Sequence, residues 1–483
     1  MPLSDPRQAR AFRFVRRGYA DGVAELVYAF DDGPELVERI EFPQPPALLA
    51  ERAGAFHAAL RLLHLVAGVS YYKAGVPSAL RVEGEQLDPA LAELLDAVYL
   101  HGLAEFAYQN KLDLRGRICF LLPPEEGRSG RQAAEGRADD GSASARRRED
   151  SEPSSGAARH LVPMTEGKSI GLPRRSLVAI GGGKDSLVSI EMLKRSAEPA
   201  TVAWIGNSEL IASCARRTAL PELNIGRRLA PELFEYNRIG AWNGHIPVTA
   251  INSAILLCAA ILYGHDSVIF SNERSASVAT LEYDGQAVNH QWSKSLEFEM
   301  RLRSYVKGHI AADLDYFSLL RPWSELAVTR AFAQDTRYDD VFSSCNRNFR
   351  IRGERPTDRW CGQCPKCHFV FLALAPFVAK PRLLAIFGRN LLDDAALAPA
   401  FDALLEYRDH KPFECVGEGR ESRAALMALA QRPEWREDAL VVRFVEDIVP
   451  QLERSELGLD PLLQPAAEHF LPARLLATLR QTV

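Results

Sequence analysis

A run of six residues near the middle of the chain has the composition of an anion-binding loop. It lies between an apolar run at 176–180 and a helical pattern at 185–195, and it reads Gly181, Gly182, Gly183, Lys184, Asp185, Ser186. Glycines let backbone N–H groups approach phosphate oxygens closely, and a helix N-terminus attracts anions. Lys184 would add a positive charge, and Asp185 could bind Mg²⁺ or orient an attacking group. The spacing matches neither GxGxxG nor GxxxxGK[ST], which excludes a Rossmann dinucleotide site and a Walker A loop.

The loop resembles the SGGxDS loop of the PP-loop ATP pyrophosphatase family. Gly181 stands where that family has serine, so backbone donors would have to replace one hydroxyl. The resemblance implies that residues 181–186 bind ATP with Mg²⁺. It also implies cleavage between the α- and β-phosphates, transfer of AMP to a carboxylate or carbonyl oxygen, and release of pyrophosphate. A glycine-rich turn without a ligand is the alternative interpretation.

Polar residues also follow two other predicted strands, at the end where nucleotide-binding sheets hold their ligands. Trp204 lies in the apolar run at 201–205 and could lie near an adenine ring. After the run at 267–270 come Glu273, which could bind a metal, and Arg274, which could bind phosphate. The alternative for this pair is an ordinary ion pair in a surface loop.

Four cysteines have the spacing of a metal site. Cys361, Cys364 and Cys367 form a CxxCxxC run, and Cys345 lies upstream. Four thiolates can hold Zn²⁺ in a closed tetrahedral site, which stabilises a fold and does not catalyse. The arrangement resembles the zinc site of the 7-cyano-7-deazaguanine synthase branch of the PP-loop family. An iron–sulfur cluster fits less well, because Phe371 occupies the position of its fourth ligand. Unliganded or redox cysteines remain a third interpretation.

Other side chains are candidates for proton transfer or substrate binding. Cys415 could act as an acid/base thiol, with Glu414 or Lys411 adjusting its pKa, although an ordinary buried cysteine is the alternative. Lys73 could hold a substrate phosphate, or it could be a solvated lysine lying over aromatic rings. The polar run at 290–295 has no role that the sequence alone reveals.

Several segments together resemble the MurL family of peptidoglycan epimerases. They read IGGGKDSLVSIEMLK, GHIPVTAIN, FSNERSAS, HQWSKSLEFE, CGQCPKCHFVFLALAPF and KPFECVGE. The resemblance implies ATP-dependent inversion of the terminal L-glutamate of UDP-N-acetylmuramoyl-L-alanyl-L-glutamate, with AMP and pyrophosphate released. It also implies a functional link to the muramoyl ligase that adds L-glutamate. Lys184 and Asp185 would then serve activation of the carboxylate, while Cys415, Glu414, Lys73 and Glu273 are candidates for moving the α-proton.

Two other function classes remain open. One is a PP-loop enzyme that amidates or thiolates a nucleobase or tRNA, and the other is a non-catalytic nucleotide-binding regulator. The formal net charge of −5 argues against nucleic acid as a partner. The most hydrophobic stretch, at 248–263, is too short to span a membrane, and the N-terminus has no secretory pattern. We therefore expect a cytoplasmic protein without a membrane partner.

The pattern of the 483 residues predicts an α/β fold with a parallel sheet. Period-two runs at 24–30 and 35–42 predict a hairpin, and helices are expected at 46–69 and from Pro89 to near Phe106. Strand, loop, helix and strand over 176–205 form a βαβ unit. We expect an N-terminal α+β domain (1–123), a linker (124–172), a PP-loop ATP-binding domain with the cysteines (173–370) and a helical C-terminal region (371–483). Within the linker, 125–160 contains no Val, Ile, Leu, Met, Phe, Trp, Tyr or Cys, so we expect it to be disordered.

Overall fold

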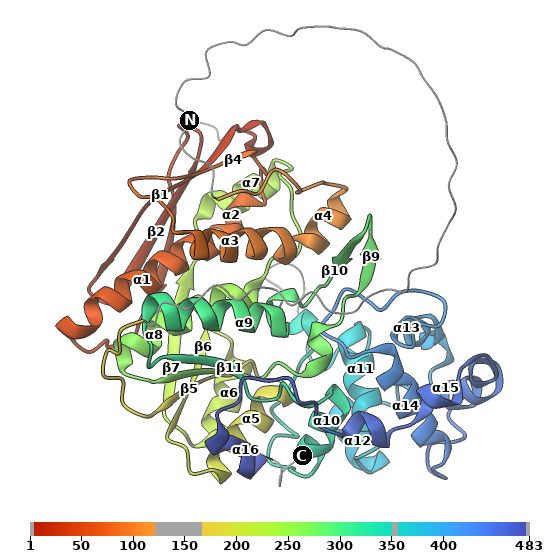
Figure 1. Ribbon diagram of the computed structural model, residues 1–483. Coiled ribbons are helices and arrows are strands. Elements are labelled where there is room, and N and C mark those ends of the chain that lie inside the picture. The colour runs from red at the N-terminus through yellow and green to blue at the C-terminus, as the bar shows by residue number, and fades with distance from the viewer. Residues whose placement is uncertain (1–3, 121–166, 350–355, 480–483) are drawn as a thin grey trace, which may run out of the picture.

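A large mixed β-sheet forms the centre of the molecule (Figure 1). The computed structural model describes residues 4–120, 167–349 and 356–479, and the segment 125–160 lies outside them. Among these residues, nine strands form one sheet in the order β11-β8-β5-β6-β7-β3-β2-β1-β4. The strands are β1 (Ala11–Ala20), β2 (Val23–Phe30), β3 (Leu36–Glu41), β4 (Ala79–Val82), β5 (Ser176–Ala179), β6 (Ala200–Ile205), β7 (Glu222–Arg228), β8 (Ser267–Phe270) and β11 (Asp315–Ser318). A separate hairpin pairs β9 (Leu281–Tyr283) with β10 (Gln286–Val288).

Five strands of this sheet, β5 to β8 and β11, run parallel to one another and form a doubly wound unit. Pairing of β11 with β8, β8 with β5, β5 with β6, and β6 with β7 is parallel throughout. In chain order these strands are arranged 3-2-1-4-5, so the order reverses beside β5. Sheets of this kind bind ligands beyond the carboxyl ends of the strands at that reversal. The predicted βαβ unit and parallel sheet are therefore confirmed.

The N-terminal strands β1 to β3 extend this sheet with antiparallel pairs, and β4 pairs parallel with β1 at its edge. β2 and β3 form the predicted hairpin, with Val27 opposite Val37, and β3 pairs with β7 antiparallel through Ile40 and Arg227. The sheet therefore runs without a break from the N-terminal region into the parallel unit. The sequence analysis did not predict β1, which alternates buried Phe12 and Phe14 with charged residues. The division of the chain into four regions stays a prediction.

Strand residues alternate between two hydrophobic cores because successive side chains point to opposite faces of a sheet. Leu177 and Val268 belong to the core that includes the helical segments 55–67 and 250–262. Val178 and Ile269 belong to the core that includes the helical segments 187–193 and 326–333. Figure 1 shows α1, α8 and α9 on one side of the parallel strands, and α5, α6 and α10 on the other. Both faces are thus covered, as a buried parallel sheet requires.

Helices occur where the sequence analysis expected them, with shifted ends. Asp88 caps α3 by accepting a hydrogen bond from Leu91 N at 2.9 Å. The α-helices are α1 (Ala50–Ala67), α2 (Val69–Tyr72), α3 (Pro89–Gly102), α4 (Ala104–Asn110), α5 (Lys184–Arg195), α6 (Glu209–Thr218), α7 (Pro231–Arg238), α8 (Val248–Tyr263), α9 (Leu296–Tyr305), α10 (Glu325–Ala333), α11 (Pro365–Leu374), α12 (Lys380–Phe387), α13 (Ala398–Leu404), α14 (Gly419–Ala430), α15 (Ala439–Arg443) and α16 (Ala473–Leu479).

Two apolar helical segments lie inside the protein. The most hydrophobic stretch of the sequence forms α8, and its residues are buried from Ser253 to Leu262. Residues Ala50–Tyr72 are long and apolar enough to cross a membrane by length and composition, but 72% of that window is buried against the rest of the chain. Burial of this kind is typical of a core helix.

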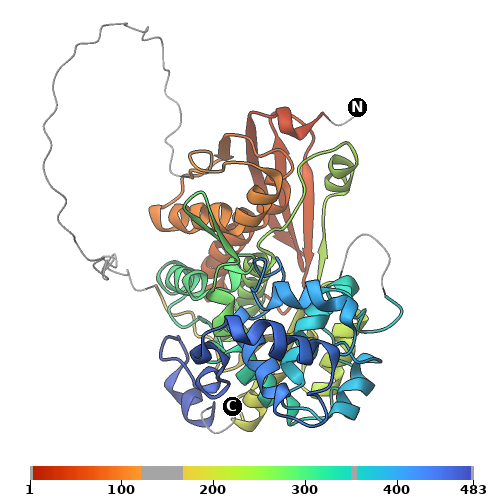
Figure 2. The same ribbon diagram turned by 90° about the vertical axis from the view of Figure 1, so that its right-hand side faces the viewer.

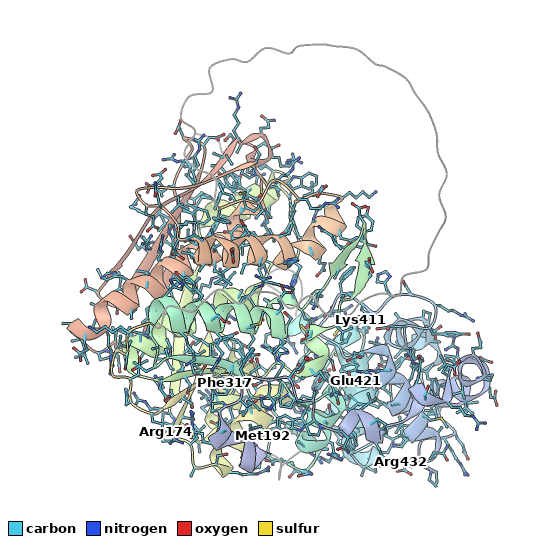
Figure 3. The ribbon with its side chains drawn as sticks, viewed as in Figure 1. Arg174, Met192, Phe317, Lys411, Glu421 and Arg432 are labelled. Atoms are coloured by element: carbon cyan, nitrogen blue, oxygen red, sulfur yellow. The ribbon has the colours of Figure 1, made fainter. Side chains whose placement is uncertain are left out.

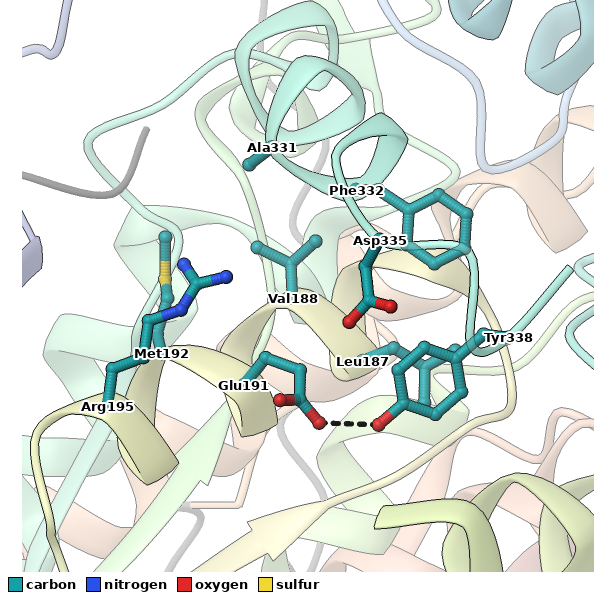
Figure 4. A pocket seen from close by; sticks show the side chains of 9 residues that line it. All are labelled: Leu187, Val188, Glu191, Met192, Arg195, Ala331, Phe332, Asp335 and Tyr338. Atoms are coloured by element: carbon teal, nitrogen blue, oxygen red, sulfur yellow. Dashed lines mark hydrogen bonds between the residues drawn. The ribbon is translucent and has the colours of Figure 1, made fainter. Parts of the chain in front are cut away.

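The C-terminal helices pack beside the parallel unit and share a hydrophobic core with it. Figure 2 shows this helical region next to the central strands. Between α5 and α10 lies a hollow of about 20 Å³, where the Tyr338 hydroxyl donates to Glu191 at 2.5 Å (Figure 4). That volume holds about one water molecule, so this hollow is too small for a nucleotide. The Tyr338–Glu191 hydrogen bond ties α5, the helix that begins at the glycine loop, to the segment after α10.

Candidate active site

Residues 181–186, the phosphate loop, form a tight turn between β5 and α5. Gly182 has φ of +76°, a conformation that favours glycine, and a Cβ there would lie 2.7 Å from the Leu210 side chain. A Cβ on Gly183 would lie 2.6 Å from Ser344 Oγ. The Ser186 hydroxyl closes the turn by donating to Gly183 O at 3.0 Å and accepting from Gly181 N at 3.3 Å. Glycine at these two positions therefore lets the loop pack closely against Leu210 and Ser344.

Lys184 does not lie where the sequence analysis expected it. Its side chain is completely buried, and Nζ donates to Asp185 Oδ1 and Glu325 Oε2. In this geometry the Lys184 ammonium is directed to Asp185 and Glu325, and it does not face a phosphate bound at the loop. The ion pairs instead hold the carboxylate of Asp185 in place. Burial raises the pKa of Asp185, but Lys184 and Lys366 lower it further, so the carboxylate is charged.

A cleft opens beyond the carboxyl ends of the parallel strands, at the point where the strand order reverses. Its volume is about 330 Å³, within the range of small-molecule sites. The phosphate loop forms one wall, and α8 and the segment after β8 form others. Its polar lining residues are Asp185, Ser186, Thr249, Asn252, Ser271, Asn272, Lys294, Ser343, Ser344, Asn346, Lys366 and Cys415, and Trp204 also borders it. The predicted loop, Trp204 and Cys415 therefore meet in one cavity.

Two lysines that the sequence analysis did not assign supply positive charge to this cleft. Lys366 is the second residue of α11, and its Nζ donates to the carbonyl oxygen of Cys415 and lies 3.6 Å from Glu325 Oε1. Lys294 Nζ donates to Cys415 Sγ at 3.0 Å. Lys366 stands inside the CxxCxxC run and Lys294 inside the polar run at 290–295. The sequence shows both runs, but it does not show that Lys366 and Lys294 lie in the same cleft.

The side chains around Cys415 favour its thiolate form. Burial raises the pKa of the Cys415 thiol, but Lys294, a hydrogen bond from His290 and Lys366 lower it to about 5. Burial lowers the pKa of His290, but hydrogen bonds to Cys415 and Glu105 raise it to about 9. The thiolate, and not the thiol, is the form that can act as a nucleophile or accept a proton. Cys415 therefore lines the cleft as a thiolate, and its role in proton transfer stays a prediction.

The two candidate ligands after β8 lie outside the cleft lining. Arg274 donates to the carbonyl oxygens of Gln464 and Leu462 at 3.3 and 3.5 Å, so its guanidinium is directed to the C-terminal segment. Glu273 is buried, at 4% exposed. Burial and the nearby Glu325 and Asp185 raise the pKa of Glu273 to about 8. The structure therefore does not bring Arg274 to the phosphate loop, and a role for Glu273 in metal binding stays a prediction.

The side chains of Lys73, Lys411 and Glu414 are not among those that line the cleft. Lys73 lies just after α2, and its Nζ donates to Asn243 Oδ1, between α7 and α8. Lys411 is buried and donates to Val278 O at 3.3 Å, and burial lowers its pKa. Figure 3 shows Lys411 and Glu421 in the region where the C-terminal helices meet the rest of the chain. There Ser275 Oγ donates to Glu421 Oε2 at 2.7 Å.

The four cysteines of the predicted metal site, the cysteine cluster, come together in space. The Sγ atoms of Cys345, Cys361, Cys364 and Cys367 all lie within 4.8 Å of one another. Three of the S···S separations are 3.4, 3.7 and 3.9 Å. Sulfur atoms at tetrahedral corners around Zn²⁺ lie about 3.8 Å apart when each Zn–S bond is about 2.3 Å. The donor set therefore fits a closed Cys₄ zinc site.

The cysteine cluster is joined directly to the phosphate loop. Ser343 N, two residues before Cys345, donates to Gly182 O at 3.0 Å. At the other side, Cys364 and Cys367 flank the first turn of α11, which carries Lys366 into the cleft. A metal at the cluster would therefore fix two walls of the cleft while having no coordination position open to substrate.

Comparisons with known proteins agree with this arrangement. Residues 3–319 match the MurL N-terminal domain, and residues 341–457 match the MurL C-terminal domain. A protein of Xanthomonas oryzae pv. oryzae is 55% identical over 478 residues, which is 98% of both chains. A protein of Salinispora tropica is 39% identical and covers 98% of this chain and 96% of its own length. Both bear the name UDP-N-acetyl-alpha-D-muramoyl-L-alanyl-L-glutamate epimerase. No solved structure matches the chain. The two domain matches and the full-length relatives show that this chain belongs to the MurL family.

Proposed function

We propose that this protein is an ATP-dependent epimerase. It would invert the terminal L-glutamate of UDP-N-acetylmuramoyl-L-alanyl-L-glutamate to D-glutamate, in the synthesis of peptidoglycan precursors. The full-length relatives are named for this substrate and activity. The observation that carries the proposal is that Cys415 and Asp185 of the phosphate loop line the same cleft. One cavity thus offers a site for activating a carboxylate and a thiol that can move a proton.

The phosphate loop is proposed to bind ATP in the manner of PP-loop enzymes. The 3-2-1-4-5 strand order and the position of the loop after β5 support a nucleotide at the carboxyl end of the sheet. Gly181, Gly182, Gly183 and Ser186 would hold phosphate oxygens, and the charged Asp185 would hold Mg²⁺. Lys366 and Lys294, which line the same cleft, are better placed than Lys184 to face an anion.

Adenylation solves the chemical difficulty of this reaction. The α-hydrogen beside a carboxylate is a very weak acid, because its carbanion would lie next to a negative charge. Transfer of AMP to the carboxylate removes that charge, so the acyl carbonyl can accept the electron pair. Loop N–H groups and nearby cations stabilise the phosphate charge that develops. Hydrolysis of the adenylate after inversion then restores the carboxylate and releases AMP.

Zinc is proposed as a structural element of this site. The cysteine cluster would hold it through four thiolates. Because the site forms only in the folded chain, zinc binding would stabilise the fold. Within this proposal, Ser343 and Lys366 transmit the position of the cluster to the cleft, because one binds Gly182 and the other binds Cys415.

The experiment that tests the proposal is mass spectrometry of the products after incubation with ATP and the UDP-muramoyl dipeptide. We expect AMP, pyrophosphate and the D-glutamyl product in equal amounts. Asp185→Asn should remove all three products while the protein stays folded, because its side chain is a quarter exposed and amide for carboxylate keeps its size. Glu93→Gln, at an exposed position on α3, is the matched control and should stay active. ADP as the nucleotide product would exclude the proposal.

A further inference from the structure

Cys415 belongs to a chain of contacts that reaches into the N-terminal region. His290 hydrogen-bonds the Cys415 side chain, and His290 Nδ1 donates to Glu105 Oε2 at 2.5 Å. Glu105 lies on α4, is 9% exposed and comes from a part of the chain 185 positions before His290. The contacts therefore connect the N-terminal region, the loop before α9 and the C-terminal region at one point.

The charges alternate in sign along this series of contacts. Glu105 is a carboxylate, His290 lies between it and the thiol, and Lys294 donates to Cys415 Sγ from the other side at 3.0 Å. His245 packs on His290 with ring centroids 4.2 Å apart. Burial and the cations His290 and Lys294 lower the pKa of His245 to about 3, so this second imidazole is neutral. A carboxylate, an imidazolium and a thiolate in sequence form the arrangement that orients and activates a nucleophile or base.

We propose that Glu105 and His290 are positioning residues that hold Cys415 as a thiolate, and that this thiolate removes the α-proton of the glutamyl residue. The proposal rests on the epimerase function given above. In the step, Sγ takes the α-proton and becomes a thiol, while the C–H electron pair moves into the carbonyl of the adenylated carboxylate. Water supplies a proton to the opposite face of the resulting enolate. The thiol then releases its proton to solvent, which restores the thiolate.

A metal ion at Glu105, His245 and His290 is the competing use of the same side chains. Their ligand atoms lie within 4.8 Å of one another, which is compatible with a metal. Lys294 and the imidazolium of His290 already bring positive charge to this point, and a divalent ion would have to displace the proton that His290 donates to Glu105. The charge balance therefore favours a proton-bearing His290.

The test measures the thiol itself. Alkylation by iodoacetamide as a function of pH, followed on the peptide that contains Cys415, gives the apparent pKa of that thiol. We expect a midpoint well below that of an ordinary thiol in the wild type. His290→Gln should raise it by more than about one unit, Glu105→Gln should raise it by less, and Glu93→Gln should leave it unchanged. An unchanged midpoint in both His290→Gln and Glu105→Gln would overturn the proposal.

Two further measurements distinguish the positioning role of Glu105 and His290 from the proposed function. In Glu105→Gln and His290→Gln, inversion should fall by about a hundredfold, while AMP release continues through hydrolysis of the adenylate. Loss of AMP release together with inversion would mean that these residues serve the fold or the nucleotide. Failure of the wild type to form AMP would instead exclude the proposed function, whatever the thiol titration shows. Elemental analysis should give equal metal content in wild type and Glu105→Gln. Loss of one metal ion in the variant would overturn the proposed positioning role of Glu105 and His290.

Discussion

Lys294 Nζ lies 3.0 Å from Cys415 Sγ, although the two residues are 121 positions apart in the chain. Lys294 follows the β9–β10 hairpin, and Cys415 lies in a loop before α14. An ammonium at this distance favours the thiolate electrostatically, and partial burial of both groups strengthens the effect. Burial and the charges of Cys415 and Glu273 act on Lys294 in return, and its pKa is raised overall. The pair therefore keeps both charges at neutral pH.

The pH dependence of turnover should reflect this ion pair. Burial opposes ionisation of Cys415, but Lys294, His290 and Lys366 bring its pKa to about 5, whereas His290 has a pKa of about 9. The thiolate and imidazolium coexist between these values, so kcat/KM should form a bell with limbs near 5 and 9. Measurement of kcat/KM from pH 4 to 10 checks this, and a profile that rises only above pH 8 would contradict it.

Stability should depend on pH over the same interval. The pKa of His290 is raised from an ordinary 6.5, so its interactions stabilise the fold fully below that value, and this stabilisation is lost as pH rises through about 9. The pKa of Cys415 is lowered from 9.0, so its contribution is lost as pH falls through about 5. Denaturant unfolding of wild type and Cys415→Ala across this pH range should show the two curves converging below pH 5.

Removal of the Lys294 charge should disable the thiolate and preserve the fold. Lys294→Met keeps most of the apolar stem, so we expect inversion to fall by about a hundredfold and the Cys415 thiol to titrate at higher pH. Lys168→Met, at an exposed position, is the matched control and should behave as wild type. Unchanged inversion in Lys294→Met would show that the contact with Cys415 has no catalytic consequence.

The cysteine cluster should carry one zinc ion per chain. Cys364→Ser removes a thiolate and should lower the free energy of unfolding by several kcal/mol, because metal binding is coupled to folding. AMP formation should also fall, because the Ser343–Gly182 hydrogen bond ties the cluster to the phosphate loop. Elemental analysis and calorimetry check both effects. Cys119→Ser is the control, since Cys119 lies outside the cluster. A folded, active preparation without metal would contradict the prediction.

Turnover in D₂O should place deuterium at the glutamyl α-position, and only when ATP is present. Without adenylation, the carboxylate charge opposes formation of the carbanion, and an ordinary side-chain base cannot overcome that at neutral pH. Nuclear magnetic resonance of product and recovered substrate measures the exchange. Exchange at a similar rate without ATP would mean that activation does not depend on the phosphate loop.

The elements and the two principal motifs were determined by local sequence. Alternating residues in β2 and β3, the apolar helix α8 and the glycines of the phosphate loop each depend on neighbours within a few positions. Period and turn chemistry therefore predict them. The cysteine spacing likewise predicted the cluster, because three of its four members lie within seven positions. For these features, the local sequence pattern is enough to predict the arrangement in space.

The tertiary structure alone decided which charges meet. Lys184 stands in the loop and was expected to contact phosphate, but Glu325 from α10 draws its ammonium into the interior. Cys415 acquires its thiolate character from Lys294 and His290, and His290 from Glu105, which is contributed by the N-terminal region. Electrostatic effects on a pKa depend on distances of a few ångströms between groups and on their burial. Residues more than a hundred positions apart have no such distance until the chain folds, so the sequence could supply the candidates but not their pairing.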